Sequence, residues 1–153
     1  MKKFCISGWL SFLLLLSCHF SRAQEQKHYN IEKGLMLNGY DAVSYFSGKP
    51  VKGKNSFQYN YNNCLYQFSS QANLDKFKLN PSQYEPAYGG WCAYAMGDKG
   101  EKVEVDPETY KIINGKLYLY YNSFFNNTLT DWNKDEANLK KKADTNWSAI
   151  IKK

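Results

Sequence analysis

Residues 84–96 read Tyr-Glu-Pro-Ala-Tyr-Gly-Gly-Trp-Cys-Ala-Tyr-Ala-Met, and this stretch carries the most information about the fold. Gly89 and Gly90 have no β-carbon, so the backbone here can lie very close to a neighbouring segment. Met96 follows Cys92 by four residues, and a helix would place both side chains on one face. The stretch therefore predicts a tightly packed junction that leads into a helix.

Two β-hairpins are predicted, one on either side of this junction. In the first, aromatic and polar side chains alternate over residues 57–61, Asn62-Asn63 forms a turn, and Cys64, Tyr66 and Phe68 occupy alternate positions on the way back. In the second, Asn114-Gly115 is a pair typical of type I′ turns, and residues 117–120 supply the returning strand. We expect this second hairpin, which bears Tyr118, to pack against the two glycines.

Helices are predicted in the remaining segments. Ser69 or Ser70 can cap a helix that runs to about Leu79. A second helix is expected to include Trp91–Met96.

The chain is also expected to be helical from Thr128 to its end, with Asp144 suited to cap the last helix. These elements predict an α+β fold, a small single domain with two β-hairpins packed against several short helices.

The N-terminus has the pattern of a secretory signal peptide. Lys2-Lys3 precedes an apolar run that includes Leu13–Leu16, and Ser21-Arg22-Ala23 fits a signal peptidase site. We therefore expect residues 1–23 to be a signal peptide and the protein to be exported, to the periplasm or the extracellular space.

A second processing route is open. Leu15-Leu16-Ser17-Cys18 resembles a lipobox, in which Cys18 would be acylated and would anchor a lipoprotein. We favour cleavage after Ala23, which leaves residues 24–35 as a flexible lead and residues 36–153 as the domain. No other run is long and apolar enough to span a bilayer, so the mature chain is expected to have no transmembrane segment.

The charge of the chain argues against a nucleic-acid partner. The formal net charge is +6, and it falls to +3 when Lys2, Lys3 and Arg22 leave with the signal peptide. Arg22 is the only arginine in the chain. A mature domain without arginine lacks the two-pronged group that recognises phosphate and guanine.

Cys64 and Cys92 are the two cysteines that remain after residue 23. In an oxidising compartment they could form a disulfide, or one could be buried while the other is functional. We predict that they are not bonded to each other, and that Cys64 lies on a hairpin strand.

The order of several short motifs resembles the exported YHS-domain proteins of bacteria. The resemblance covers most of residues 36–148. The motifs are Gly39-Tyr40-Asp41, Tyr45-Phe46, Tyr66-x-Phe68-Ser69, Phe77-x-x-x-Pro81-x-x-Tyr84-x-Pro86, Tyr88-Gly89-Gly90-Trp91-Cys92-Ala93, Asp106-Pro107, Asn114-Gly115-Lys116-Leu117-Tyr118-Leu119 and Lys142-Ala143-Asp144-x-Asn146-Trp147.

Short YHS modules occur in metal-transporting ATPases, oxygenase subunits and metal-responsive proteins, so the resemblance implies a metal-related role. Cys92 is the position that matches the exported family. A thiolate and a thioether are soft ligands, so Cys92 with Met96 would suit copper, and Cys64 or His28 could complete a copper or zinc site. The alternative is that Cys92 and Met96 are ordinary core residues.

A different class of function is an interaction module without metal. Its aromatic surface, bearing Tyr40, Asp41, Tyr45, Tyr88 and Trp91, would bind a partner protein or a small apolar ligand. Asp41 could instead cap a turn. We expect no enzymatic activity, because a serine or cysteine nucleophile would have to use the single histidine of the mature chain as its base.

Overall fold

The computed structural model describes residues 28–153, and the predicted signal peptide and Cys18 lie outside them. The first half of the described chain is built on a four-stranded sheet with the strand order β1-β2-β4-β3. Its strands are β1 (Ile31–Glu32), β2 (Leu35–Met36), β3 (Lys54–Tyr61) and β4 (Cys64–Phe68). None of the helices in residues 28–153 is both long and apolar enough to cross a bilayer.

The first predicted hairpin is confirmed as β3 and β4, which pair antiparallel. Asn62 and Asn63 form the turn with φ angles of 50° and 60°, a left-handed conformation that asparagine tolerates well. Leu35 of β2 pairs in parallel with Leu65 of β4. The segment expected to be a flexible lead therefore ends in two strands that join the sheet.

Short helices surround this sheet. They are η1 (Leu37–Gly39), η2 (Ser44–Ser47), α2 (Gln71–Leu79) and α3 (Pro81–Tyr84). The first predicted helix is confirmed as α2, because the Ser70 side chain accepts a hydrogen bond of 3.2 Å from the backbone N–H of Asn73. Pro81 stops α2 and starts α3, where its missing N–H costs nothing.

The junction between the two halves consists of η3 (Ala87–Gly90) and α4 (Ala93–Asp98). The predicted helix start at Trp91 is wrong, since Trp91 is extended and Cys92 occupies the N-cap position of α4. Tyr88 has a φ of +53°, so it does not share a helix face with Cys92.

The second predicted hairpin is confirmed as β5 (Asp106–Ile113) and β6 (Lys116–Tyr120). Asn114 and Gly115 at its turn have φ angles of 50° and 75°. Bridges from Pro86 to Leu117 and from Cys92 to Leu119 place β6 beside the junction.

The last part of the chain contains a small hairpin and two helices. They are β7 (Asn122–Ser123), β8 (Asn126–Asn127), α5 (Thr128–Trp132) and α6 (Glu136–Ile151). The expectation that Asp144 caps the last helix is wrong. The helix begins one residue after Asp135, and nothing between there and Ile151 interrupts it, so Asp144 lies inside α6.

The glycine pair has the expected close contact, but with a different partner. A β-carbon at Gly89 would lie 2.6 Å from the carbonyl oxygen of His28 and 3.0 Å from the Trp147 ring. At Gly90 no neighbour would be closer than 3.5 Å. The crowded element is therefore the segment at His28 together with α6, and not the hairpin that bears Tyr118.

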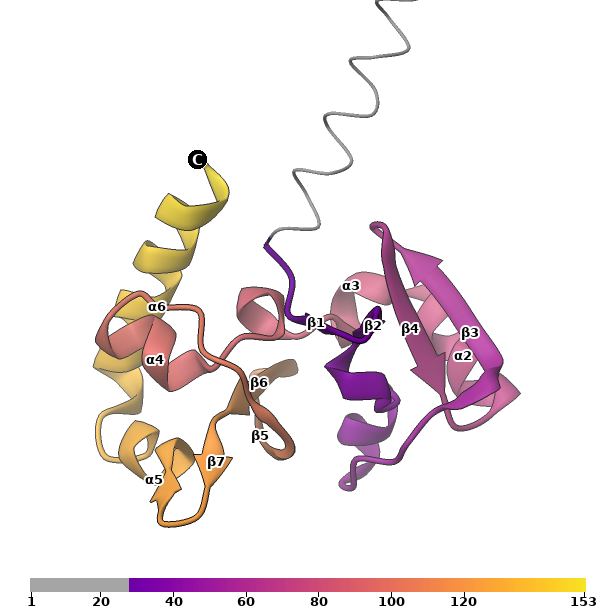
Figure 1. Cartoon of the computed structure of the whole chain (residues 1–153), viewed down its shortest axis with the longest axis horizontal. Coiled ribbons are helices and arrows are strands. Elements are labelled where there is room, and N and C mark those ends of the chain that lie inside the picture. Colours follow the sequence, from indigo (N-terminus) through magenta and orange to yellow (C-terminus); the bar gives the residue numbers. More distant parts are fainter. Residues whose placement is uncertain (1–27) are drawn as a thin grey trace, which may run out of the picture.

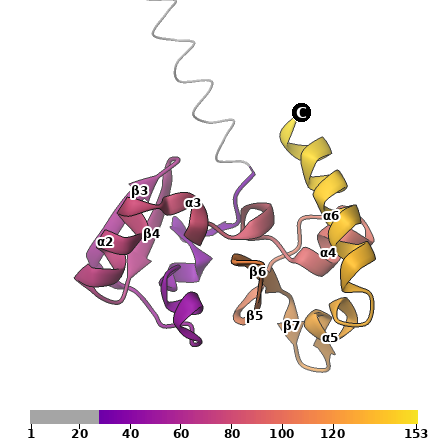
Figure 2. The same ribbon diagram turned by 180° about the vertical axis from the view of Figure 1, so that it is seen from behind.

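Figures 1 and 2 show α2, β3 and β4 at one end of the molecule, α4, α5 and α6 at the other, and the β5–β6 hairpin between them. Each end has its own hydrophobic core. Because successive side chains of a strand point in opposite directions, β6 contributes to both. Leu117 and Leu119 belong to the first core, whereas Tyr118 and Tyr120 belong to the second.

Candidate functional site

The three residues predicted to bind a metal are all buried, but they lie in different surroundings. Cys64 belongs to the core under the sheet, and Met96 belongs to the core formed by α4 and α6. No disulfide joins Cys64 to Cys92, as predicted. Within residues 28–153, no three His, Cys, Asp or Glu side chains are grouped so that they could hold a metal ion.

Cys92 is fully buried at the start of α4 and contacts the base of the β7–β8 hairpin. Its Sγ atom accepts a hydrogen bond of 3.3 Å from the backbone N–H of Tyr121 and lies 3.5 Å from Oγ1 of Thr128. The Thr128 hydroxyl donates its own proton to the Tyr121 carbonyl, at 2.8 Å. The thiol of Cys92 is therefore the donor toward Thr128, which gives it a structural role at this point.

The residues expected to form one aromatic surface do not lie together on the surface. Asp41, Tyr45 and Tyr88 are buried, with at most 5% of each residue exposed. The Tyr45 hydroxyl donates to the carbonyl oxygen of Pro107 at 2.8 Å. Only Tyr40 and Trp91 of this set are partly exposed.

Asp41 serves the alternative role of capping a turn. One carboxylate oxygen accepts hydrogen bonds from the backbone N–H groups of Val43 and Ser44, at 2.9 and 3.3 Å. The other accepts from the backbone and hydroxyl of Ser69 and from the amide of Asn73, at 2.6 to 2.8 Å. These contacts tie the turn before η2 to the start of α2 and occupy both oxygens.

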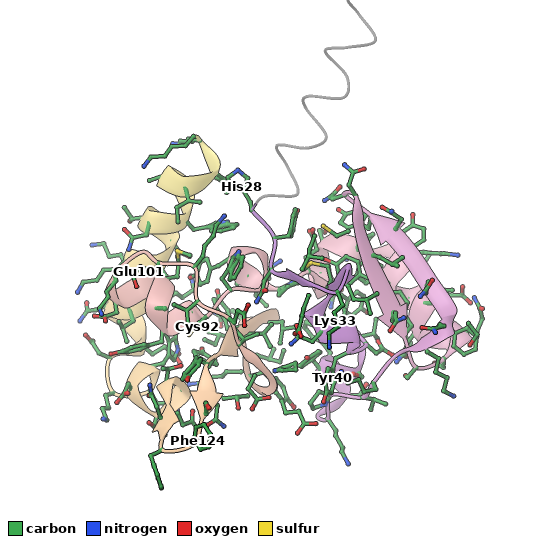
Figure 3. The ribbon with its side chains drawn as sticks, viewed as in Figure 1. His28, Lys33, Tyr40, Cys92, Glu101 and Phe124 are labelled. Atoms are coloured by element: carbon green, nitrogen blue, oxygen red, sulfur yellow. The ribbon has the colours of Figure 1, made fainter. Side chains whose placement is uncertain are left out.

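A pocket of about 560 Å³ lies between the junction, the turn end of both hairpins and α6. We call it the junction pocket. Figure 3 shows His28, one of its residues, near the C-terminal half of α6. Its lining residues come from five separate segments and are His28, Tyr29, Asn62, Glu85, Pro86, Ala87, Tyr88, Gly89, Lys116, Tyr118, Asp144, Trp147 and Ile151.

Aromatic rings form one end of the junction pocket. The Tyr88 ring meets Tyr118 edge to face at a centroid distance of 5.7 Å, and it meets Trp147 edge to face at 6.3 Å. The Tyr88 hydroxyl donates to Oδ1 of Asp144 at 2.9 Å. Burial and this hydrogen bond raise the pKa of Tyr88 far above its ordinary value, so the phenol stays protonated and holds α6 against the junction.

A positively charged and a negatively charged side chain, with polar neighbours, form the other end of the junction pocket. Lys116 is half-buried, and burial lowers the pKa of its amine. Nearby, Oε1 of Glu85 accepts long hydrogen bonds from the Tyr29 hydroxyl and the Asn62 amide, at 3.5 and 3.4 Å. Burial and then the negative charge of Glu85 raise the pKa of Tyr29 to about 12. This end can both donate and accept hydrogen bonds.

Among the lining residues, sequence reasoning identified Tyr88 as a surface residue and His28 as a possible metal ligand, and it did not group the two. The motifs that carry the family resemblance nevertheless contain Lys116, Tyr118 and Trp147. Their distance in sequence from Tyr88 concealed that they share a pocket with it. The bridge between Pro86 and Leu117 brings β6 to the junction, and the packing of α6 against the junction brings Trp147.

Comparison with known proteins identifies one part of the chain. Residues 42–88 match a family model, that of the YHS domain. Neither a curated protein nor a solved structure matches the chain. The matched segment runs from the turn that Asp41 caps to Tyr88 in the junction pocket.

Proposed function

Since this chain contains a YHS domain, at residues 42–88, we propose that it is an exported, non-catalytic binding protein with its ligand in the junction pocket. The observation that carries the proposal is the pocket itself. Its volume of about 560 Å³ lies within the range of pockets that hold small organic molecules. Its aromatic end and its polar end also match the usual composition of such sites.

The charges of the pocket restrict the class of ligand. Lys116 and Glu85 have opposite charges and line the same end, so a strongly ionic ligand would meet one like charge there. A neutral ligand with hydroxyl or amide groups can accept from the amine and donate to the carboxylate. The rings of Tyr88, Tyr118 and Trp147 favour an apolar or planar face on the remainder of the ligand.

A screen of small neutral compounds by NMR amide shifts would test this proposal. A ligand of the proposed site shifts the amides of Gly89 and Tyr118, and Trp147→Ala weakens its binding by about tenfold or more. Tyr94→Ala is the matched control, because Tyr94 is a half-buried aromatic residue outside the pocket. Ligands whose shifts cluster elsewhere, or that bind equally well to Trp147→Ala, would contradict the proposal.

The export and the lack of catalysis in this proposal rest on the sequence. Intact mass of the exported protein should correspond to a chain that begins at Gln24. A diacylglycerol-modified Cys18 at the N-terminus would instead assign it to the lipid-anchored proteins. The proposal of no catalysis rests on His28, the single histidine that follows the predicted signal peptide, because a serine or cysteine nucleophile would have to use it as its base.

A soft metal ion, copper or zinc, at Cys92 is a second candidate. One contact favours it: the Tyr121 N–H that points at the sulfur would also stabilise a thiolate. Metal handling is frequently associated with the YHS domain, which supports the same candidate. The contact of the thiol with Thr128 opposes it, because a thiolate has no proton to donate.

Anaerobic competition against a Cu(I) chelator separates the two candidates. Metal binding at Cys92 predicts weaker Cu(I) binding for Cys92→Ser and for Met96→Leu, with Cys64→Ser as the test of a third ligand. Equal affinities for the wild type and all three variants would remove the metal candidate. That outcome would leave the proposal for the junction pocket intact.

A further inference from the structure

Two adjacent phenylalanines project into solvent at the tip of the β7–β8 hairpin. Phe124 and Phe125 have relative exposures of 100% and 106%, so neither ring packs against the protein. Large apolar side chains in a soluble domain are normally at least partly covered. In Figure 3 Phe124 points away from the body of the molecule, on the side opposite to His28.

The backbone at this tip disfavours phenylalanine. Asn122 pairs with Asn127 and Ser123 pairs with Asn126, so Phe124 and Phe125 are the two residues of a tight turn. Phe124 adopts a φ of +51°, a left-handed conformation that suits glycine or asparagine and is unfavourable for a bulky side chain. The turn does not need an aromatic residue for its own folding.

The base of the hairpin is firmly attached to the domain. The backbone N–H of Thr128 donates to the carbonyl oxygen of Tyr121 at 3.0 Å, and the Thr128 hydroxyl donates to the same oxygen. Cys92 accepts from the N–H of Tyr121 on the other side. The two rings are therefore presented on an anchored support.

We propose that the Phe124–Phe125 tip docks on the surface of a lipid bilayer, where both rings enter the interfacial region. The area of the tip favours this partner over a protein. Two aromatic side chains bury a few hundred Å² at most, which is far below the roughly 1,000 Å² expected for a specific protein interface. A bilayer accepts a small apolar protrusion without a matching pocket.

The charge around the tip fits the same partner. Residues 117–130 contain no charged side chain, so the hairpin itself carries no ion into the interface. Asp98, Lys99 and Glu101 line a groove with Asn126, so the two rings must insert shallowly to leave these charges in water. The asparagines and serine beside the rings can form hydrogen bonds at the level of the headgroups. Binding should therefore depend weakly on salt, and the junction pocket at the other end should stay open to solution.

Sedimentation with phosphatidylcholine vesicles tests this inference on the processed protein, with the absence of a lipid anchor confirmed by intact mass. We expect reversible partitioning onto the vesicles. Salt at about 0.5 M, which screens interactions between exposed charges, should leave the partition coefficient nearly unchanged. Phe125→Ser and Phe124→Asn should each lower the partition coefficient by about tenfold, the loss expected for one buried ring. The double variant should not sediment.

Two controls accompany these variants. Leu79→Ser removes another exposed apolar residue, 86% accessible at the end of α2, and should leave partitioning unchanged. Phe124→Asn places a residue that tolerates the left-handed conformation at a strained position. The melting temperature of this variant should therefore not fall below that of the wild type, so a loss of partitioning cannot be due to unfolding.

Three results would overturn the inference. The wild type could fail to partition on protein-free vesicles, as it would if the rings bound a protein. The Phe124→Asn and Phe125→Ser variants could partition like the wild type. Salt could abolish the binding, which would assign it to the lysines of the chain.

Discussion

The sulfur of Cys92 lies 3.3 Å from the backbone nitrogen of Tyr121, and this contact joins the start of α4 to the base of the β7–β8 hairpin. It connects the residue that was the leading metal candidate to the exposed phenylalanine tip. In the fold this thiol accepts the hydrogen bond of the Tyr121 backbone N–H.

Replacement of Cys92 should therefore destabilise the protein. Cys92→Ala leaves the Tyr121 N–H without its acceptor and should lower the free energy of unfolding by about 1–3 kcal/mol. Cys92→Ser should lose less, because its hydroxyl can still accept. Urea denaturation measures both. Equal stability of Cys92→Ala and the wild type would show that the contact contributes nothing.

Gly89→Ala should destabilise the protein through a collision as well as through backbone strain. Its β-carbon would lie 2.6 Å from the carbonyl oxygen of His28. Gly34→Ala is the matched control, because Gly34 also has a positive φ but its β-carbon would meet nothing within 4 Å. The difference in unfolding free energy between the two variants should be about 1–3 kcal/mol.

Thermal unfolding of both glycine variants gives this difference directly. Gly89→Ala should also weaken ligand binding, because it would displace His28 and Trp147 at the junction pocket. A Gly89→Ala protein as stable as Gly34→Ala would mean that the segment at His28 can move away without cost.

Asp41→Ala should cost about 3 kcal/mol or more, because several buried or half-buried donors lose their acceptor together. Asp41→Asn should be nearly as damaging, since its amide nitrogen would face N–H and O–H donors. Asp75→Asn, an exposed change on α2, should stay close to the wild type. Guanidinium denaturation checks all three, and a mild effect of Asp41→Ala would argue that Asp41 is held for a ligand.

The stability of the second core should depend on pH through Glu136. Hydrogen bonds from Lys111 and from the Trp132 indole lower the pKa of this carboxyl below its ordinary value. The unfolded chain therefore takes up the proton first as the pH falls, and the stabilisation is lost as the pH drops through the folded-state pKa.

Glu136→Gln should remove this dependence. Between about pH 5 and about pH 3 the variant should lose less stability than the wild type, by roughly 0.2–1 kcal/mol for a pair near the surface. Tryptophan fluorescence, to which the buried Trp132 contributes, reports the unfolding transition at each pH. Parallel pH profiles for the two proteins would show that the ion pair does not stabilise the fold.

The sequence predicted the local structure well where a few neighbouring residues determine it. Asn62-Asn63 and Asn114-Gly115 identified both hairpins because the turn conformation depends on these residues themselves. The cap expected at Ser69 or Ser70 and the end expected at about Leu79 gave the limits of α2 for the same reason, and the structure selects Ser70 as the cap. The helix at Cys92 was placed too early, because the positive φ angles of Tyr88 and its neighbours are imposed by tertiary packing.

The site was harder to predict because it depends on contacts between distant segments. Tyr88 and Asp144 are separated by 56 positions, and their hydrogen bond forms only after α6 has folded back onto the junction. The four-residue spacing grouped Cys92 with Met96 instead, because such spacing predicts which residues share a helix face and not which residues are neighbours in the tertiary structure. The exposure of Phe124 and Phe125 could likewise not be predicted, because nothing in the sequence distinguishes them from the many aromatic residues that are buried.

The lining of the junction pocket lies partly inside and partly outside the segment that matches the YHS domain, and His28 and Tyr29 precede that segment. Asn62 and residues 85–88 lie inside the matched segment, whereas Lys116, Tyr118, Asp144, Trp147 and Ile151 follow it. Substitutions after residue 88 would therefore change one part of the pocket while the matched segment keeps its core. If the proposed ligand binds in this pocket, a chimera that exchanges the residues after 88 should change which ligand it binds.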